Sequence, residues 1–166
     1  MIYKIKKGSH YKQGFKVSLT FKDQIRFQCL FDESCVYDLK SNDNYDINKL
    51  YGFGTSFHHH MQSARVGWRC LDNKNIQLVS YTYDGKSWKN RLKEQVLGTV
   101  RPGQAFTCTI TIGDNLYRYD FHSEDEKNSV YDPIYRKCWP IRHILFPYFG
   151  GNMPAPHDMS LEVTRV

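Results

Sequence analysis

Alternation of apolar and polar residues is the feature of this sequence that most restricts its fold. Over four segments, apolar side chains occupy every second position. A period of two residues places such side chains on one face of a β-strand, whereas a helical face needs a period of about 3.6 residues. The sequence therefore predicts two β-hairpins: residues 16–21 with 25–31 around Lys22-Asp23-Gln24, and residues 106–112 with 117–121 around Gly113-Asp114-Asn115.

Further strands extend this pattern along the chain. About nine or ten short strands with almost no helical periodicity favour an antiparallel sandwich or a barrel. We predict an all-β fold, a jelly-roll-like antiparallel β-sandwich that spans residues 1–166 as a single domain. The remaining predicted strands are 64–71, 76–83, 95–100, 141–146 and 159–165, the last with Met159, Leu161 and Val163 inward, and turns are predicted at 72–75, 84–85 and 101–103.

Two long segments do not fit a strand pattern. Residues 40–62 and 122–140 are polar and aromatic, and neither shows a regular period. Connections of this length are uncommon in a compact domain unless they carry function or are disordered. They are therefore the first places to look for a site.

Composition and cysteine pattern argue against several classes of protein. No apolar run approaches the roughly 18 residues that span a membrane, and the N-terminus lacks an apolar signal region. We therefore expect no membrane partner and a location in the cytoplasm of a bacterium or an infected host cell. The five cysteines form no CxxC pair, so neither a disulfide framework nor a zinc ribbon is indicated.

The net charge of +6 is concentrated near the N-terminus. Residues 1–30 contain Lys4, Lys6, Lys7, Lys12, Lys16, Lys22 and Arg26 against the single acid Asp23, while the rest of the chain is balanced. Such a cluster attracts anions, including the phosphates of nucleic acids. The alternative is a solvated sheet face or an edge strand protected by lysines.

The first candidate binding segment is the predicted strand around Gly67. Ser63, Arg65, Gly67 and Arg69 share one face of that strand because side chains alternate. Two guanidinium groups on one face need carboxylates or an anionic ligand, and Gly67 would leave room for a ligand near the backbone. The alternative is that both arginines are exposed or paired with Asp or Glu.

Three consecutive histidines precede this strand. His58 and His60 have a spacing that shares one face of a strand, and His157 or Asp158 would be needed to complete a metal site. No third ligand is fixed by the spacing, so we predict no metal and no other cofactor. His58, His59 and His60 are instead expected to donate hydrogen bonds to a ligand or to loop carbonyls.

The second candidate segment is residues 146–158. Gly150 and Gly151 permit positive φ and close backbone approach, and two prolines stiffen the return. Aromatic faces beside a few polar groups suit a sugar or a nucleobase, although a packed corner of the core would show the same residues. The predicted ligand contacts here are Tyr148, Phe149, Asn152 and His157, with Tyr81 extending the same wall.

The sequence carries no recognised catalytic motif. A GxSxG elbow, a P-loop, a GxGxxG loop and a paired-carboxylate glycosidase motif are all lacking. A lyase or hydrolase that uses His and Tyr, with Arg as charge stabiliser, stays open as an alternative to simple binding.

Residues 63–69 and 147–152, within this strand pattern, resemble parts of small concanavalin-like or jelly-roll sandwiches from bacteria and phages. Such sandwiches commonly bind carbohydrate, and some phage proteins of this size sequester nucleotide immune signals. The resemblance therefore implies ligand binding without choosing the ligand.

Three hypotheses follow from these observations. The leading one is a non-catalytic protein that captures a small anionic, nucleotide-derived molecule, as a phage-type sequestering protein would. The alternative is carbohydrate binding or cleavage by the same surface, and the third is nucleic-acid binding by the N-terminal cluster. Under the first two, Arg65 or Arg69, at least one histidine, and Tyr148 or Phe149 should line one cavity, and binding should change as the histidines titrate near neutral pH.

Overall fold

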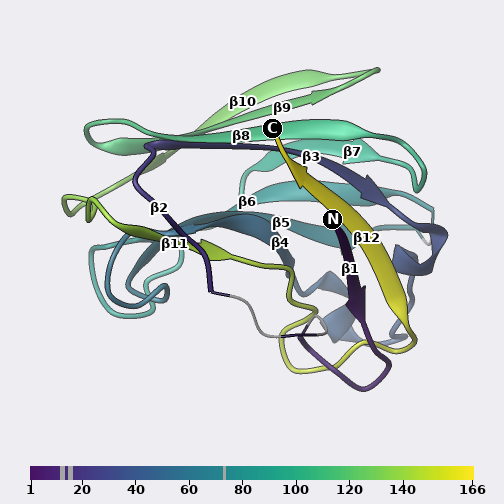
Figure 1. Ribbon diagram of the computed structural model, residues 1–166. Coiled ribbons are helices and arrows are strands. Elements are labelled where there is room, and N and C mark those ends of the chain that lie inside the picture. The colour runs from purple at the N-terminus through teal and green to yellow at the C-terminus, as the bar shows by residue number, and fades with distance from the viewer. Residues whose placement is uncertain (12–13, 15–16, 73) are drawn as a thin grey trace.

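Two antiparallel β-sheets pack face to face in the computed structural model, which describes residues 1–11, 14, 17–72 and 74–166 (Figure 1). Sheet A has the strand order β1-β12-β3-β8-β9-β10, and sheet B has the order β2-β11-β4-β5-β6-β7. The predicted all-β antiparallel sandwich is confirmed. The strands are β1 (Ile2–Ile5), β2 (Leu19–Thr20), β3 (Gln24–Phe31), β4 (Asn48–Gly54), β5 (Gln62–Cys70), β6 (Ile76–Asp84), β7 (Val96–Val100), β8 (Phe106–Ile112), β9 (Leu116–Ser123), β10 (Lys127–Pro133), β11 (Arg142–Leu145) and β12 (Met159–Arg165), and two short 3-10 helices are η1 (Glu33–Cys35) and η2 (Asn42–Tyr45).

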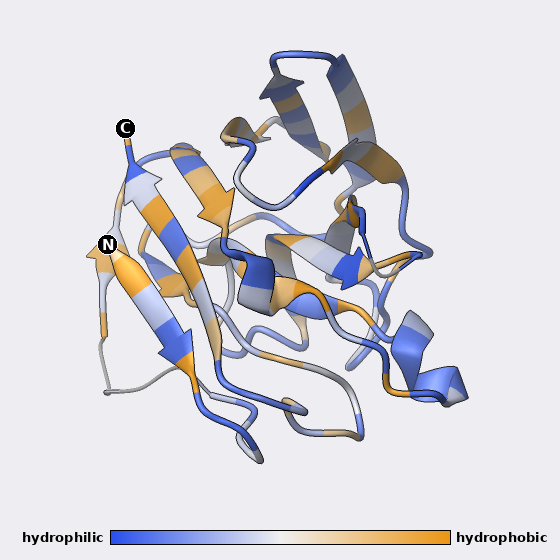
Figure 2. Cartoon of the chain, turned by 90° about the vertical axis from the view of Figure 1, so that its right-hand side faces the viewer, coloured by the Kyte–Doolittle hydropathy of each residue, from blue (hydrophilic) through white to orange (hydrophobic). Residues whose placement is uncertain are grey.

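The hydrophobic core lies between the two sheets because the strands turn their apolar faces inward. Along β12, buried Met159, Leu161 and Val163 alternate with more exposed residues, as the sequence predicts. Figure 2 shows this alternation as orange and blue bands on β12. Aromatic rings join the sheets in the interior, where the ring of Phe31 from sheet A lies 5.0 Å from that of Trp68 in sheet B.

One predicted hairpin is confirmed and the other is wrong. β8 and β9 pair as neighbours, but β2 pairs with β11 in sheet B while β3 pairs with β8 and β12 in sheet A. Residues 21–23 therefore link the two sheets. Arg142 holds this link through an ion pair with Asp23. The apolar side of the preceding segment faces solvent, since Val17, Leu19 and Phe21 are all exposed.

The two segments expected to be irregular contain the strands β4 and β10. Alternation is lost in β4 because most of its residues are buried and a β-bulge between Lys49 and Tyr51 shifts the register. β10 escapes detection for the opposite reason, because it is a largely polar strand at the edge of sheet A. β1 was also not predicted.

Three residues used in the sequence predictions lie outside the described residues. They are Lys12 and Lys16 of the N-terminal charge cluster and Asn73 of the predicted turn. Within the part of the chain that the structure describes, no helix is long and apolar enough to cross a membrane.

Candidate ligand-binding groove

A cavity of about 620 Å³ lies on the face of sheet B that points away from sheet A. Ala64 and Val66 of β5 face the core, so Arg65 between them faces the opposite side and enters this cavity. We call the cavity the groove. Its lining residues are Tyr11, Gly14, Lys49, His59, His60, Arg65, Tyr81, Ile144, Leu145, Phe146, Pro147, Tyr148, Gly150 and Gly151.

Arg65 is the central charge of the groove. Its Nε is buried and has no hydrogen-bond partner, and no carboxylate lies within ion-pair distance of its guanidinium among the described residues. Burial lowers the pKa of Arg65 to about 10, so the side chain stays charged at neutral pH. A buried Nε–H without a hydrogen-bond acceptor is costly, and a bound anion would remove that cost.

Lys49 adds a second cation from the bulge of β4. Its Nζ donates a hydrogen bond of 2.7 Å to the Gly150 carbonyl and lies 5.1 Å and 5.2 Å from the ring centroids of Tyr81 and Tyr148. Burial, and then the charge of Arg65, lower the pKa of Lys49 to about 8. The groove therefore holds two cations that repel each other.

The loop that contains His58, His59 and His60, which we call the histidine loop, forms one wall of the groove. Ser63 is buried in β5 and does not reach the groove; its hydroxyl donates a 2.7 Å hydrogen bond to the His59 carbonyl and so fixes the loop. Burial and the neighbouring Arg65 lower the pKa of His59 to about 3, and burial also lowers the pKa of His60. The ring of His59 is therefore neutral at pH 7, which contradicts the predicted titration of this residue near neutrality. His58 stacks on His59 outside the lining.

The opposite wall comes from the segment after β11. Tyr148 exchanges two backbone hydrogen bonds with Lys49, of 2.8 Å and 2.9 Å, which attach this segment to the bulge of β4. Gly150 has φ of 81°, a conformation that favours glycine, and this turns the chain back so that its carbonyl reaches Lys49. Arg65 and Tyr148, far apart in sequence, thus line the same cavity with His59 and His60.

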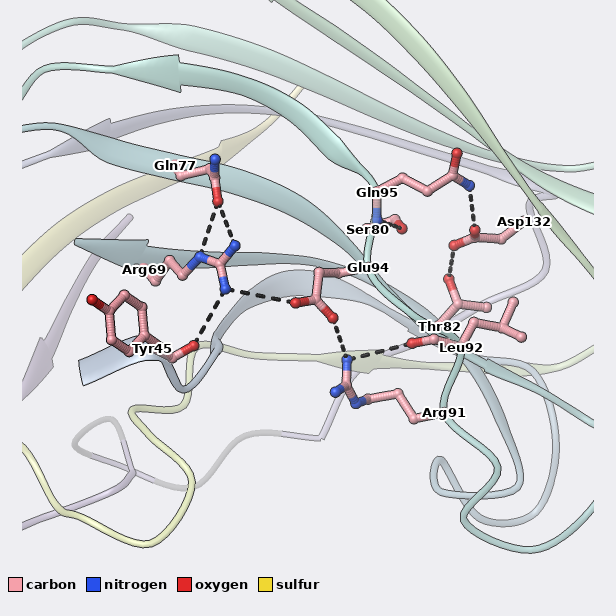
Figure 3. A network of polar contacts seen from close by, with 10 residues as sticks. All are labelled: Tyr45, Arg69, Gln77, Ser80, Thr82, Arg91, Leu92, Glu94, Gln95 and Asp132. Atoms are coloured by element: carbon pink, nitrogen blue, oxygen red, sulfur yellow. Dashed lines mark hydrogen bonds and ion pairs between the residues drawn. The ribbon is translucent and has the colours of Figure 1, made fainter. Parts of the chain in front are cut away.

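Arg69 does not join Arg65, because it already has partners. Its Nε and Nη2 both donate to Gln77 Oε1, at 2.9 Å and 2.7 Å, and its Nη1 lies 3.6 Å from Glu94. Glu94 also pairs with Arg91 at 3.2 Å, as Figure 3 shows. The prediction that Arg69 contacts the ligand is thus not supported by its position, since its guanidinium is already bound to Gln77 and Glu94.

Three residues of the second predicted segment also lie elsewhere. Phe149 is 1% exposed and packs its ring against Tyr37 in the core. His157 is hydrogen-bonded to the Ser34 carbonyl and lines a separate hollow beside Arg101. Asn152 is exposed outside the groove lining.

The sequence reasoning missed Lys49, which lines the groove, and His143, whose pKa is affected by Arg65. Lys49 sits at a bulge inside a segment that shows no regular period, so no alternation marks it. His143 of β11 packs its ring against Gly54, where any Cβ would overlap it, and burial followed by the charge of Arg65 lowers its pKa. Two sequence features could have indicated His143: the predicted strand 141–146, which contains it, and the glycines Gly52 and Gly54 of β4, which allow close packing.

Other predicted features do not form a site. Among the described residues, no group of three or more His, Cys, Asp or Glu is arranged to hold a metal ion. The basic N-terminal residues are dispersed: Lys4 and Arg26 lie on strands separated by β12, and Lys6 pairs with Asp158.

Known proteins share the fold of this chain at low sequence identity. Neither models of protein families nor curated protein sequences gave a match. An alginate lyase from Klebsiella pneumoniae matches with a TM-score of 0.61 at 9% identity, over 86% of this chain and 59% of that chain. A functionally unknown protein from Saccharomyces cerevisiae matches with a TM-score of 0.52 at 10% identity, over 99% of this chain and 87% of the other. A polysaccharide lyase of family 18 matches with a TM-score of 0.50 at 10% identity, over 99% and 78%.

These matches show a jelly-roll-like β-sandwich fold and no specific family. The chain spans 59% of the length of the alginate lyase that it matches. A fold of this kind carries several functions, so the ligand has to be argued from the groove itself.

Proposed function

We propose that this protein binds an acidic carbohydrate, a chain that contains uronic acids, in the groove of sheet B. The observation that carries the proposal is the partly buried guanidinium of Arg65, whose buried Nε has no hydrogen-bond partner and which has no carboxylate partner in a cavity lined by tyrosine rings. A uronic acid offers both complements: a carboxylate for the guanidinium and an apolar ring face for the tyrosines.

The charge balance of the groove supports an anion rather than a neutral sugar. Arg65 and Lys49 together bring two positive charges into a partly buried space. Glu94 is already paired with Arg69 and Arg91. The charge of Asp46 acts on Lys49, but Asp46 forms no ion pair with Lys49 or Arg65. An anionic ligand would relieve the repulsion between the two cations. A neutral glucan would leave it in place.

The fold comparison favours carbohydrate over nucleotide among anionic ligands. Two of the matching structures are lyases whose names give alginate or polysaccharide as substrate, and alginate is itself a polymer of uronic acids. Nothing in the comparison supports the nucleotide hypothesis or a nucleic-acid partner. The alternative hypothesis from the sequence, carbohydrate binding or cleavage, therefore becomes the leading hypothesis.

Binding of defined polymers to the purified protein tests the proposal. Alginate and polygalacturonate should bind, whereas a neutral glucan should not, and affinity should fall when ionic strength is raised from about 0.01 M to about 0.15 M. Arg65→Gln should lower the affinity by about tenfold or more. Arg101→Gln removes an exposed arginine outside the groove and serves as the matched control.

The same titrations separate the alternatives. Tight binding of a mononucleotide or cyclic nucleotide, with no binding of either polyuronate, would refute the proposal in favour of the nucleotide hypothesis. Equal affinity for the neutral glucan would refute the role of Arg65. A rise in ultraviolet absorbance during incubation, from double bonds formed in the polymer, would identify cleavage as well as binding.

A further inference from the structure

A row of rings and one cation crosses the outer face of sheet B. Lys49 Nζ connects the rings of Tyr148 and Tyr81, at 5.2 Å and 5.1 Å. The row continues from Tyr81 to Tyr83, with 5.9 Å between ring centroids, and from Tyr83 to His60 at 5.3 Å. Since strands in a sheet lie about 4.8 Å apart, a row that runs from β4 across to β6 is much longer than one sugar ring.

The row does not stop at the edge of the groove. The ring of His60 lies 4.2 Å from His59, His59 lies 4.9 Å from His58, and His58 lies 4.7 Å from the indole of Trp88. Trp88 is 52% exposed, which leaves about half of a large apolar side chain facing solvent. A half-exposed indole offers an apolar face on which a sugar ring can stack.

The local backbone holds Trp88 in this position. Its loop is joined to the histidine loop by hydrogen bonds from Lys89 N to the His60 carbonyl, 2.9 Å, and from Gly85 N to the Met61 carbonyl, 3.1 Å. Lys89, directly after Trp88, has φ of 62°, in the left-handed region that a lysine seldom adopts. The hydrogen bonds of the loop hold Lys89 in this conformation and so fix the indole of Trp88 beside His58.

We infer that the binding site extends from the groove to Trp88, so that the ligand is a chain of several sugars and Trp88 is a specificity-determining contact for chain length. This inference rests on the proposed function. Carboxylates bind at Arg65 and Lys49, and the sugars further along the chain stack on Tyr83, His58 and Trp88 in turn. A monosaccharide or disaccharide fills only the groove and does not reach the indole.

Oligouronates of defined length, prepared from alginate and from polygalacturonate, test the inference by calorimetry. For the unmodified protein, affinity should rise steeply from the disaccharide to the hexasaccharide. Trp88→Ala should lower the affinity for the hexasaccharide by about tenfold and change that for the disaccharide by less than about twofold. Trp88→Tyr, which keeps a ring, should restore most of the loss.

Tyr131→Ala is the matched control, because Tyr131 is equally exposed but lies on β10 of the other sheet. Thermal unfolding of each variant shows that it is folded. Equal affinity for disaccharide and hexasaccharide, or a Trp88→Ala loss that is the same at every length, would overturn the inference and leave the proposed function intact. Failure of every oligouronate and polyuronate to bind would instead reject the proposed function.

Discussion

Lys49 and Arg65 show how one pair of side chains sets the electrostatics of the groove. Each is placed by strand geometry, Lys49 by a bulge and Arg65 by simple alternation, and each has its pKa lowered, first by burial. Arg65 was accessible to sequence reasoning because it lies in a regular strand beside Gly67. Lys49 was not, because a bulge removes the period on which such reasoning depends.

The lowered pKa of Lys49 predicts a pH dependence of binding. Lys49 loses its proton above about pH 8, whereas Arg65, with a pKa of about 10, stays charged. Above pH 8 the protein must take up a proton in order to bind an anion at full strength, so affinity for a polyuronate should fall by up to about tenfold per pH unit. Calorimetry between pH 7 and pH 9, spanning that pKa of about 8, measures the fall.

Two substitutions check that Lys49 is the titrating group. Lys49→Gln should bind more weakly at pH 7 but with little dependence on pH through this window. Lys49→Arg keeps the charge to high pH and should also flatten the curve. An unchanged pH profile in Lys49→Gln would show that another group is responsible.

At the scale of elements, a buried polar network links sheet B to the edge of sheet A. Thr82 Oγ1 of β6 donates a hydrogen bond to Asp132 Oδ2 of β10 at 2.5 Å and contacts the Tyr119 hydroxyl of β9 at the same distance. Gln95 Nε2 donates to Asp132 Oδ1 at 2.7 Å, and Figure 3 shows this contact beside the Arg69 pairs. β10, a largely polar strand, is held by its backbone pairing with β9 and by these side-chain bonds.

Loss of Asp132 should therefore destabilise the protein. Asp132→Ala removes the buried acceptor of Thr82, whereas the exposed Gln95 keeps its bond to the Tyr131 carbonyl. The loss at Thr82 should lower the free energy of unfolding by about 1–3 kcal/mol. Urea denaturation followed by tyrosine and tryptophan fluorescence measures this change. Asp120→Ala removes the exposed ion pair with Arg118 and an exposed hydrogen bond from Ser129, and it should cost less than Asp132→Ala. Equal losses in the two variants would mean that the network does not hold β10.

The elements also show where sequence patterns fail. β5, β6, β8, β9 and β12 were predicted close to their true limits because one face of each is core and the pattern follows the burial. β2 was misread because its apolar side chains face solvent at the edge of sheet B. Its true partner, β11, is more than a hundred residues away in the sequence. Pairing over such distances leaves no local signal in a single sequence.

At the scale of the whole molecule, four buried cysteines can serve as probes of unfolding in both sheets of the sandwich. Cys29 and Cys108 lie in sheet A and Cys70 in sheet B, while Cys35 is in η1; each is at most 2% exposed. Burial raises the pKa of Cys35 to about 12 and that of Cys29 well above its ordinary value, so neither forms the reactive thiolate while buried. Cys138 is only partly buried.

We predict that residues 1–166 unfold as one cooperative domain, and thiol labelling can test this. In the native protein a thiol-reactive disulfide reagent should label Cys138 quickly, and Cys138→Ser should abolish that fast phase. The four buried cysteines should then react together in a single slow phase, because each requires the two sheets to separate. Mass spectrometry of partly labelled samples should show one label or all five, with few intermediate species. A population in which Cys29 and Cys108 are labelled while Cys70 is protected would mean that sheet A opens independently, and would contradict a single cooperative unit.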